Sequence, residues 1–525
     1  MGVYLNPGNG LFQMAVNSQI YVDKTALIKY TNKLIGGQQR FICISRPRRF
    51  GKSMAANMLA AYYGKDCNSA ELFDGFKIAG QEDYRKHLNQ YNVIALNIQN
   101  FFSLIPEVDG ALKYLQKRVL KELRDSYPDI VDGDEVFLSI ALEDVYSQTQ
   151  QPFIFIIDEW DCILRDRSYT EDDHRKYLDF IRNLLKDRAY ISLAYMTGIL
   201  PVKKCGTHSA LNMFTEYSMT DAGDFAEYIG FTEDEVLELC TEYDVDFEQM
   251  RSWYDGYVFP YGLHIYNPKS VVDSLLRKNF SSYWTQTETY EALKCYIQLN
   301  YDGLKDAVIQ MLAGDKVRID TETFQNDMTT FRNRDDVLTL LIHLGYLAFE
   351  QASSSVFIPN SEVAAEFVRS VRSCKWDEVM LAIENSEKLL RATWSMNEAE
   401  VADMIDSVHQ ENTSILTYND ENALSCVITL AYYYARNEYT QIRELPAGRG
   451  FADIVYIPKR HSDKPAMVIE LKYDRTAGSA IDQIRNRKYV EALKDYHGNL
   501  LLVGINYNKV TKKHECKIEK LQKTL

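Results

Sequence analysis

The chain of 525 residues contains no long hydrophobic run. No stretch approaches the ~20 consecutive apolar residues that a helix needs to span a bilayer. The first residues, Met1 to Pro7, show no basic segment followed by a long apolar one, so we expect no signal peptide. The nine cysteines are scattered, without a Cys-x-x-Cys pair or a metal-ligand spacing. These absences argue against membrane insertion and favour a cytoplasmic protein with reduced thiols.

Positive charge is scarce over most of the chain. The net charge of −15 argues against a surface that coats DNA indiscriminately. From Gln441 to Leu525, however, 17 Lys and Arg stand against 10 Asp and Glu, a balance of +7 that leaves −22 for the rest. A basic C-terminal segment suits a nucleic-acid-handling end, although a solvated lysine-rich tail explains part of it equally well. The lysines of that tail are Lys512, Lys513, Lys517, Lys520 and Lys523.

Length and composition predict several folded domains. A chain of 525 residues is too long for one hydrophobic core, and its 46% hydrophobic and 25% charged residues are typical of a folded soluble protein. No low-complexity linker or internal repeat divides it. From the motifs described below we predict three domains, at residues 1–225, 226–385 and 386–525.

The first predicted domain contains a Gly-Lys-Ser turn between a strand and a helix. The apolar run 40–45 is typical of a buried strand, and residues 54–63 predict a helix. In such a turn, backbone N–H groups face the phosphates of a nucleotide, Lys52 reaches the β- and γ-phosphates, and the Ser53 hydroxyl ligates Mg²⁺. The first glycine of the general pattern is replaced here by Arg46.

A second buried strand, 152–157, ends in two acids. This pattern predicts Asp158 in the water shell of Mg²⁺ and Glu159 as the base for the hydrolytic water. The alternative is a strand that ends in acids at the rim of a sheet. A third run, 191–198, contains Thr197 near its end, where the hydroxyl could sense a γ-phosphate. The predicted ATP-binding residues are Arg46, Gly51, Lys52, Ser53, Met54, Asp158 and Thr197.

The order of these runs predicts an α/β fold. A glutamate directly after Asp158 suggests the P-loop ATPases that have an extra strand between the two nucleotide motifs. We therefore expect a parallel sheet with ligands at the carboxyl ends of its strands, and 93–98 as a further strand.

The middle of the chain is predicted to be helix-rich. Thr232 and the acids after it mark a helix start. The aromatic turn 253–257 favours packing between domains over stacking on a base. Residues 337–367 predict a helix, a hairpin and a second helix, an order that resembles a winged helix. Such a unit serves as often as a lid on the nucleotide as it serves to read DNA.

Near the C-terminus, Asp453 precedes a hairpin whose second strand carries Glu470 and Lys472. Side chains alternate along a strand, so Glu470 and Lys472 share one face. Two carboxylates, Asp453 and Glu470, would hold Mg²⁺, and the lysine would orient the attacking water or stabilise the charged phosphorane. An ordinary strand pair with a surface salt bridge explains the same spacing.

Taken together, the chain resembles bacterial AAA-ATPase-like proteins with a C-terminal nuclease domain of the PD-(D/E)XK superfamily. In these proteins Arg46-Pro-Arg-Arg-Phe-Gly-Lys-Ser53 is the usual form of the P-loop. The resemblance implies that Glu421 is the first, helix-borne acid of the nuclease site and that Gln483 is the glutamine after Glu-x-Lys; helix capping explains Glu421 as well. The matching segments are Tyr21–Thr25, Arg46–Ser53, Ile157–Asp161, Thr197–Gly198, Trp253–Tyr257, Gly345–Leu347, Ile358–Val363, Gly448–Asp453, Ile469–Lys472, Gln483–Ile484 and Val503–Tyr507.

The sequence thus predicts an ATPase with a fused Mg²⁺-dependent nuclease-like domain that acts on nucleic acid, with DNA as the expected substrate. The first alternative is a nucleotide-controlled switch whose C-terminal domain binds nucleic acid or a protein partner without cutting. The second is an ATPase that remodels protein. A homo-oligomer is compatible with each of these.

Overall fold

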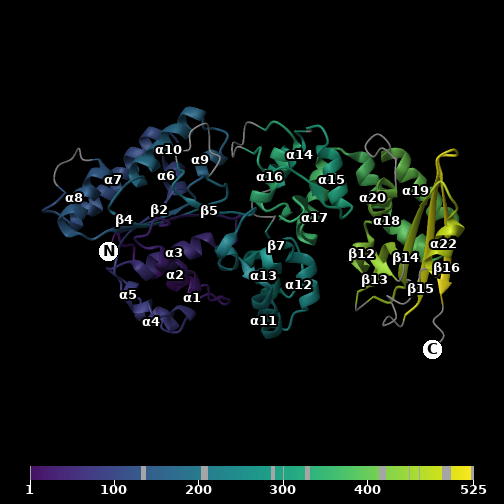
Figure 1. Ribbon diagram of the computed structural model, residues 1–525, viewed down its shortest axis with the longest axis horizontal. Helices are drawn as coiled ribbons and strands as arrows, with labels where there is room; N and C mark the ends of the chain where they lie inside the picture. The colour runs from purple at the N-terminus through teal and green to yellow at the C-terminus, as the bar shows by residue number, and fades with distance from the viewer. Residues whose placement is uncertain are drawn as a thin grey trace. The chain divides into compact units, whose positions relative to one another are not determined.

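The computed structural model describes the chain in two compact units (Figure 1). One unit comprises Met1–Thr289 and Arg318–Ala364, and the other Tyr290–Val317 and Ala365–Leu525. The described residues are all except 1, 132–136, 203–210, 285–289, 300, 325–330, 413–420, 448–449, 460–461, 487–497 and 522–525. No helix among the described residues is long and apolar enough to cross a membrane. The eight cysteines in the described part of the chain are free thiols.

A five-stranded parallel sheet forms the centre of the first unit, in the order β2-β3-β4-β1-β5. Its strands are β1 (Phe41–Ser45), β2 (Asn92–Asn97), β3 (Phe153–Asp158), β4 (Ile191–Gly198) and β5 (Thr215–Tyr217). Strands β1, β3 and β4 are buried along their whole length because helices cover both faces of a parallel sheet. Strand β4 lies between β1 and β3, which confirms the predicted extra strand.

Helices form a layer on each face of this sheet: Figure 1 shows α1–α5 on one side and α6–α10 on the other. They are α1 (Gly10–Val16), α2 (Ala26–Leu34), α3 (Lys52–Tyr63), α4 (Ala70–Phe73), α5 (Tyr84–His87), α6 (Ile98–Leu104), α7 (Val108–Ser126), α8 (Leu138–Thr149), α9 (Cys162–Arg165) and α10 (Glu171–Leu185). The predicted helix after the Gly-Lys-Ser turn is α3, and it begins at Lys52.

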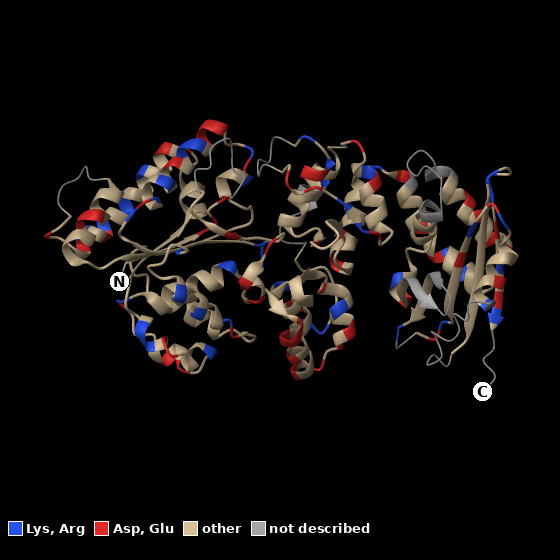
Figure 2. Ribbon diagram, in the orientation of Figure 1, with Lys and Arg blue, Asp and Glu red and all other residues tan. Residues whose placement is uncertain are grey.

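The segment after the parallel sheet forms a small antiparallel sheet, β6-β8-β7, that packs beside three helices. The elements are β6 (Phe231–Thr232), α11 (Glu233–Tyr243), α12 (Phe247–Tyr254), β7 (Tyr257–Phe259), β8 (Leu263–Tyr266) and α13 (Pro268–Arg277). Thr232 caps α11 in a capping box with Glu235, as its sequence predicts. Figure 2 shows acidic residues along α11.

The predicted helix, hairpin and helix are also present. They are α16 (Arg334–Leu344), the antiparallel pair β10 (Ala348–Glu350) and β11 (Ser355–Phe357), and α17 (Ser361–Ser373). The aromatic turn 253–257 packs inside this unit, because the Tyr257 hydroxyl donates to the carbonyl of Gly345 and its ring meets Phe50 edge-on at 5.5 Å. The remaining short elements of the chain are β9 (Val317–Arg318) and the 3₁₀ turns Lys77–Gly80, Gly223–Tyr228 and Pro260–Gly262.

The second unit is built on a five-stranded mixed sheet, β12-β13-β14-β15-β16. Only β14 and β15 are parallel, and α22 connects them. A Cβ atom at Gly504 would lie 2.4 Å from the carbonyl oxygen of Ala477, so α22 approaches β15 as closely as only glycine permits. The strands are β12 (Tyr439–Ala447), β13 (Gly450–Pro458), β14 (Ala466–Tyr473), β15 (Leu500–Asn508) and β16 (Lys513–Leu521).

Helices complete this unit: α14 (Tyr290–Ile297), α15 (Leu304–Leu312), α18 (Asp377–Trp394), α19 (Glu398–Asn412), α20 (Glu421–Ala431), α21 (Ala435–Glu438) and α22 (Ala477–Asn486). Lys513, Lys517 and Lys520 lie on β16, an edge strand, and Figure 2 shows basic residues along it. Lysines on an exposed edge discourage pairing with another strand, so part of the basic balance has a structural role. The predicted fold class, a P-loop sheet followed by an α/β nuclease-like domain, is confirmed.

Candidate functional site

The loop between β1 and α3 has the backbone of an anion-binding turn. Gly51 has φ = 94°, which L side chains rarely adopt, and Arg49 has φ = 67°. Helix α3 of 12 residues starts directly after Gly51, and no side chain caps its N-terminus. The first N–H groups of a helix lack intrahelical partners and carry partial positive charge. The loop therefore presents uncommitted backbone donors beside Lys52.

Lys52 is buried within this loop. Its ammonium donates to the carbonyl oxygens of Arg46 at 3.0 Å and Pro47 at 2.9 Å. Burial lowers the pKa of Lys52, and the nearby carboxylates of Glu159 and Asp158 oppose that shift. A buried cation held by neutral carbonyls can accept an anionic ligand, because a phosphate would replace neutral partners with a charged one.

Asp158, at the end of β3, accepts three hydrogen bonds from side chains, in addition to one from the backbone N–H of Glu159 at 3.1 Å. Ser53 Oγ donates to Oδ2 at 2.7 Å, Asn97 Nδ2 donates to Oδ2 at 3.3 Å, and the Thr197 hydroxyl donates to Oδ1. These partners come from α3, β2 and β4, so three elements orient one carboxylate. Ser53 and Asp158 offer oxygen ligands, the kind that Mg²⁺ prefers.

Glu159 has the left-handed backbone conformation, φ = 52°, and ion-pairs with Arg165 of α9. Arg165 also pairs with Asp161 at 3.0 Å. Asp161 is fully buried and accepts the N–H groups of Ile199 and Leu200 at 3.0 and 2.7 Å. Arg165 thus links the predicted base to a buried carboxylate that fixes the end of β4.

A cavity of about 610 Å³ lies beside the loop between β1 and α3 in the first unit. Of the predicted residues, it is lined by Gly51, Lys52, Ser53, Met54 and Glu159, and Asp158 is not among the lining residues. Apolar side chains from segments that the motifs did not assign to the site also line it: Ile20, Tyr21, Val22, Phe231 and Val272. The segment Tyr21–Thr25, one of those that carry the family resemblance, is the sequence signal that could have identified part of this lining.

Two predicted nucleotide ligands point elsewhere. The Arg46 side chain is fully buried, donates to the carbonyls of Ser45 at 3.0 Å and Tyr217 at 3.3 Å, and lies over the Phe259 ring. Burial lowers its pKa to about 10. Thr197 is also fully buried and is hydrogen-bonded to Asp158. Neither side chain lines the cavity, so Arg46 shapes the loop and Thr197 orients Asp158.

In the second unit, β14 and α22 bring three predicted residues together. Lys472 Nζ donates to Glu470 Oε1 at 3.1 Å, and the Gln483 amide donates to the same oxygen. Glu470 and Lys472 share a face of β14, as expected from the alternation of side chains. Glu470 is 1% exposed and Lys472 8%.

Asp453 and Glu421 are placed only by their backbone. Asp453 lies on β13, where Ile454 pairs with Ile469, so Asp453 and Glu470 each stand one residue beyond this pair. Glu421 is the first residue of α20. Both side chains lie outside the described part of the structure, and their roles stay predictions.

Comparison with known proteins identifies two matching regions. The model of a family described as "Predicted AAA-ATPase" matches residues 11–207. The model of the "PD-(D/E)XK nuclease superfamily" matches residues 419–517.

An "Uncharacterized protein in vnfD 5'region" of Azotobacter chroococcum mcd 1 is 24% identical over 288 residues, 51% of this chain and 51% of that protein. The match thus spans about half of this relative's length. Among solved structures, the Aeropyrum pernix ORC2 protein in its ADPNP-ADP complexes has a TM-score of 0.31 and 9% identity, covering 69% of this chain and 97% of that one.

The two family matches cover the two candidate sites, the loop between β1 and α3 and the cluster of Glu470, Lys472 and Gln483. The chain therefore carries a predicted AAA-ATPase domain followed by a domain of the PD-(D/E)XK nuclease superfamily.

Proposed function

We propose that the first unit binds ATP together with Mg²⁺ and hydrolyses it. The observation that carries this proposal is the convergence of Lys52, Ser53 and Asp158 beside a helix N-terminus and a cavity of about 610 Å³. A cavity of this volume, lined both by apolar side chains and by cations such as Arg48 and Lys52, suits the base and the phosphates of a nucleotide. Tyr21, Val22 and Phe231 would contact the base, and the loop from Gly51 to Ser53 would contact the phosphates.

Ser53 and Asp158 would hold Mg²⁺, which when bound would neutralise charge on the phosphate oxygens. Lys52 would add a fixed positive charge beside the same oxygens. Asn97 and Thr197 would keep Asp158 in one orientation, so little reorganisation is needed when the ligand arrives.

Glu159 would accept a proton from the attacking water. Its carboxylate is engaged by Arg165, so this ion pair has to open or shift before Glu159 can act on water. Arg165 would therefore restrain Glu159 until a nucleotide is in place.

For the second unit we propose Mg²⁺-dependent cleavage of nucleic acid, with DNA as the expected substrate. Asp453 and Glu470 would hold the metal ion, Lys472 would orient the water or stabilise the charged phosphorane, and Gln483 would position Glu470. Glu421 would add the helix-borne acid that the superfamily resemblance implies. The contact of Lys472 and Gln483 with one carboxylate oxygen supports this assignment.

The alternative is a nucleotide-controlled switch whose second unit binds nucleic acid or a protein without cutting it. One observation favours it: Glu470 is 1% exposed, so a metal ion has little direct access to its carboxylate.

The test is a cleavage assay on single- and double-stranded DNA and RNA, with Mg²⁺ or Mn²⁺, with and without ATP. Metal-dependent products from the wild type that disappear in Glu470→Ala support the nuclease. Tight binding without products in any combination supports the switch.

A further inference from the structure

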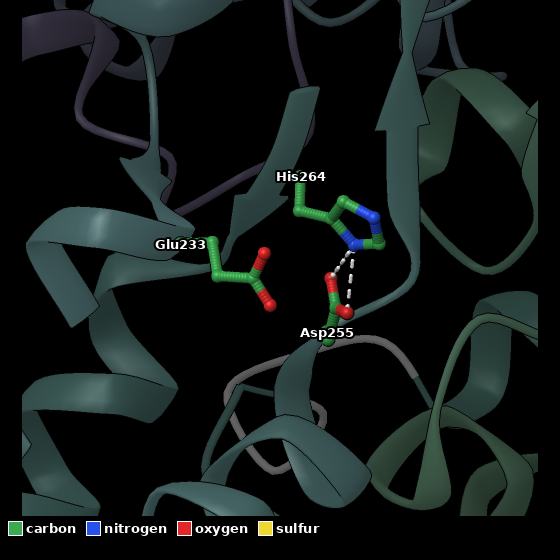
Figure 3. Close-up of side chains that lie close together, drawn as sticks. All are labelled: Glu233, Asp255 and His264. Atoms are coloured by element: carbon green, nitrogen blue, oxygen red, sulfur yellow. Dashed lines mark hydrogen bonds and ion pairs between the residues drawn. The ribbon is translucent and has the colours of Figure 1, made fainter. Parts of the chain in front are cut away.

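A cluster outside both sites joins a histidine and two carboxylates: Glu233, Asp255 and His264. Figure 3 shows the three side chains turned toward one another from separate elements. Glu233 opens α11, Asp255 follows α12, and His264 lies on β8. One potential ligand atom from each residue lies within 4.8 Å of the others.

The two best-fixed members are Asp255 and His264. His264 Nδ1 lies 2.8 and 3.0 Å from the carboxylate oxygens of Asp255. The backbone after Asp255 is constrained, since Gly256 has φ = 121° and a Cβ there would lie 2.2 Å from the Pro359 carbonyl oxygen. The Asn360 amide also donates to the Asp255 carbonyl at 2.8 Å. The cluster is therefore held by rigid elements, as a metal site requires.

Charge in the cluster is unbalanced. Glu233 and Asp255 carry two negative charges, and the nearest cation in the described structure is Arg251, whose Nε lies 3.6 and 3.7 Å from them. The Asp255 side chain is only 10% exposed, whereas that of Arg251 is 48% exposed. A divalent ion would neutralise both carboxylates, and the arginine can turn toward solvent when it binds.

A buried hydroxyl next to the cluster supplies a second, independent observation. Tyr266 lies two residues after His264 on β8, so the two side chains share a face of the strand. Its fully buried hydroxyl has no hydrogen-bond partner among the described residues. Buried tyrosine hydroxyls normally find a partner, and a metal-bound water would be one.

We propose that Glu233, Asp255 and His264 form a binding site for a divalent transition-metal ion, with Zn²⁺ preferred. An imidazole nitrogen with two carboxylate oxygens suits Zn²⁺ better than Mg²⁺ or Ca²⁺, which take oxygen ligands. Ligand atoms about 2.1 Å from a tetrahedral ion lie about 3.4 Å apart, so the side chains need to close by at most about 1.4 Å. The ion would tie α11, the turn after α12 and β8 together.

The experiment uses the full chain, stripped with a chelator and kept in excess Mg²⁺ without nucleotide, so that Mg²⁺ occupies the oxygen-rich sites. Zinc content after gel filtration and Zn²⁺ affinity by competition with a chromophoric chelator are measured. His264→Ala should lose one equivalent of zinc, and Glu233→Gln, at a half-buried position, should weaken binding at least ~10-fold. His174→Ala, which removes a half-buried histidine of α10, is the matched control and should retain the wild-type content.

Arg251→Ala separates a metal site from a cluster of ion pairs. It removes the cation that competes for both carboxylates, so Zn²⁺ should bind several-fold more tightly than in the wild type. The extended X-ray absorption fine structure of bound zinc should show one imidazole ligand in the wild type. Equal zinc content in the wild type and His264→Ala, or a weaker Zn²⁺ affinity in Arg251→Ala, would overturn the proposal.

Discussion

The hydroxyl of Ser53 at the start of α3 donates a hydrogen bond of 2.7 Å to the carboxylate of Asp158 at the end of β3. The two residues are 105 positions apart in the chain, and the parallel sheet brings them to the same edge. This contact joins the phosphate-binding loop to the carboxylate that we assign to Mg²⁺. Two predictions follow from the surroundings of this contact, a third from the Glu470 cluster of the second unit and a fourth from His409, and a final measurement addresses the nucleotide site itself.

Glu159→Gln should keep ATP bound while slowing its hydrolysis by about 100-fold, because the amide keeps the shape of the side chain and cannot accept the proton of water. Single-turnover hydrolysis and nucleotide retention on a desalting column measure the two effects. Glu143→Gln, on the exposed side of α8, is the control and should behave as the wild type. Wild-type hydrolysis by Glu159→Gln would remove Glu159 from the role of base.

Asp161→Ala should destabilise the first unit by about 3 kcal/mol, since it leaves the buried Arg165 guanidinium without its 3.0 Å partner. It also removes the acceptor for the N–H groups of Ile199 and Leu200. Denaturant unfolding measures the loss of stability. Asp179→Ala, on the exposed face of α10, serves as the control. An unchanged midpoint would mean that this ion pair adds nothing to stability.

The double variant Asp453→Ala/Glu470→Ala should lose the metal site of the second unit, because no pair of carboxylates is left to share the ion. Calorimetry with Mn²⁺ should show one fewer site in the double variant than in the wild type, and any cleavage should stop. Asp482→Ala, an exposed acid on α22, is the control. Equal Mn²⁺ stoichiometry in the double variant and the wild type would contradict the assignment.

The stability of the second unit should fall as the solution becomes acidic. Burial lowers the pKa of His409 to about 4, whereas an unfolded histidine titrates near ~6.5. The folded state thus favours the neutral ring, and this contribution is complete above about pH 6.5 and is lost as the pH falls toward 4. His514, 5.3 Å from His409 between ring centroids, also has its pKa lowered by burial.

His409→Phe replaces the ring with one that does not titrate. Thermal midpoints between pH 7.5 and 4.5 should therefore decline less steeply in this variant than in the wild type. Carboxylates titrate in both proteins and cancel in the comparison. Parallel pH profiles would show that His409 does not contribute.

Much of the fold was predictable from local patterns. The apolar runs before Arg46 and Asp158 indicate buried strands, and Gly51 followed by Lys52 and Ser53 marks the start of α3. The face shared by Glu470 and Lys472 follows from strand alternation alone. The predicted domain boundaries near residues 225 and 385 stay predictions.

The rest depends on contacts between distant segments, which a local pattern does not encode. The cavity wall at Tyr21 and Phe231 combines the N-terminal segment with β6. The pairing of Glu159 with Arg165 depends on the short helix α9. The position of Arg46 in the sequence suggests a phosphate ligand. Its side chain is buried instead, because it donates hydrogen bonds to backbone carbonyls and packs over the Phe259 ring.

The central claim is that the first unit is an ATP-hydrolysing site built around Lys52. The most direct measurement is steady-state ATP hydrolysis with Mg²⁺, together with calorimetric ATP binding, for the wild type and Lys52→Ala. Lys117→Ala, on the exposed face of α7, controls for the loss of a lysine. The account predicts turnover by the wild type and by Lys117→Ala, and a loss of at least ~100-fold in Lys52→Ala. A wild-type protein that neither binds nor hydrolyses ATP, or a Lys52→Ala variant with unchanged turnover, would contradict it.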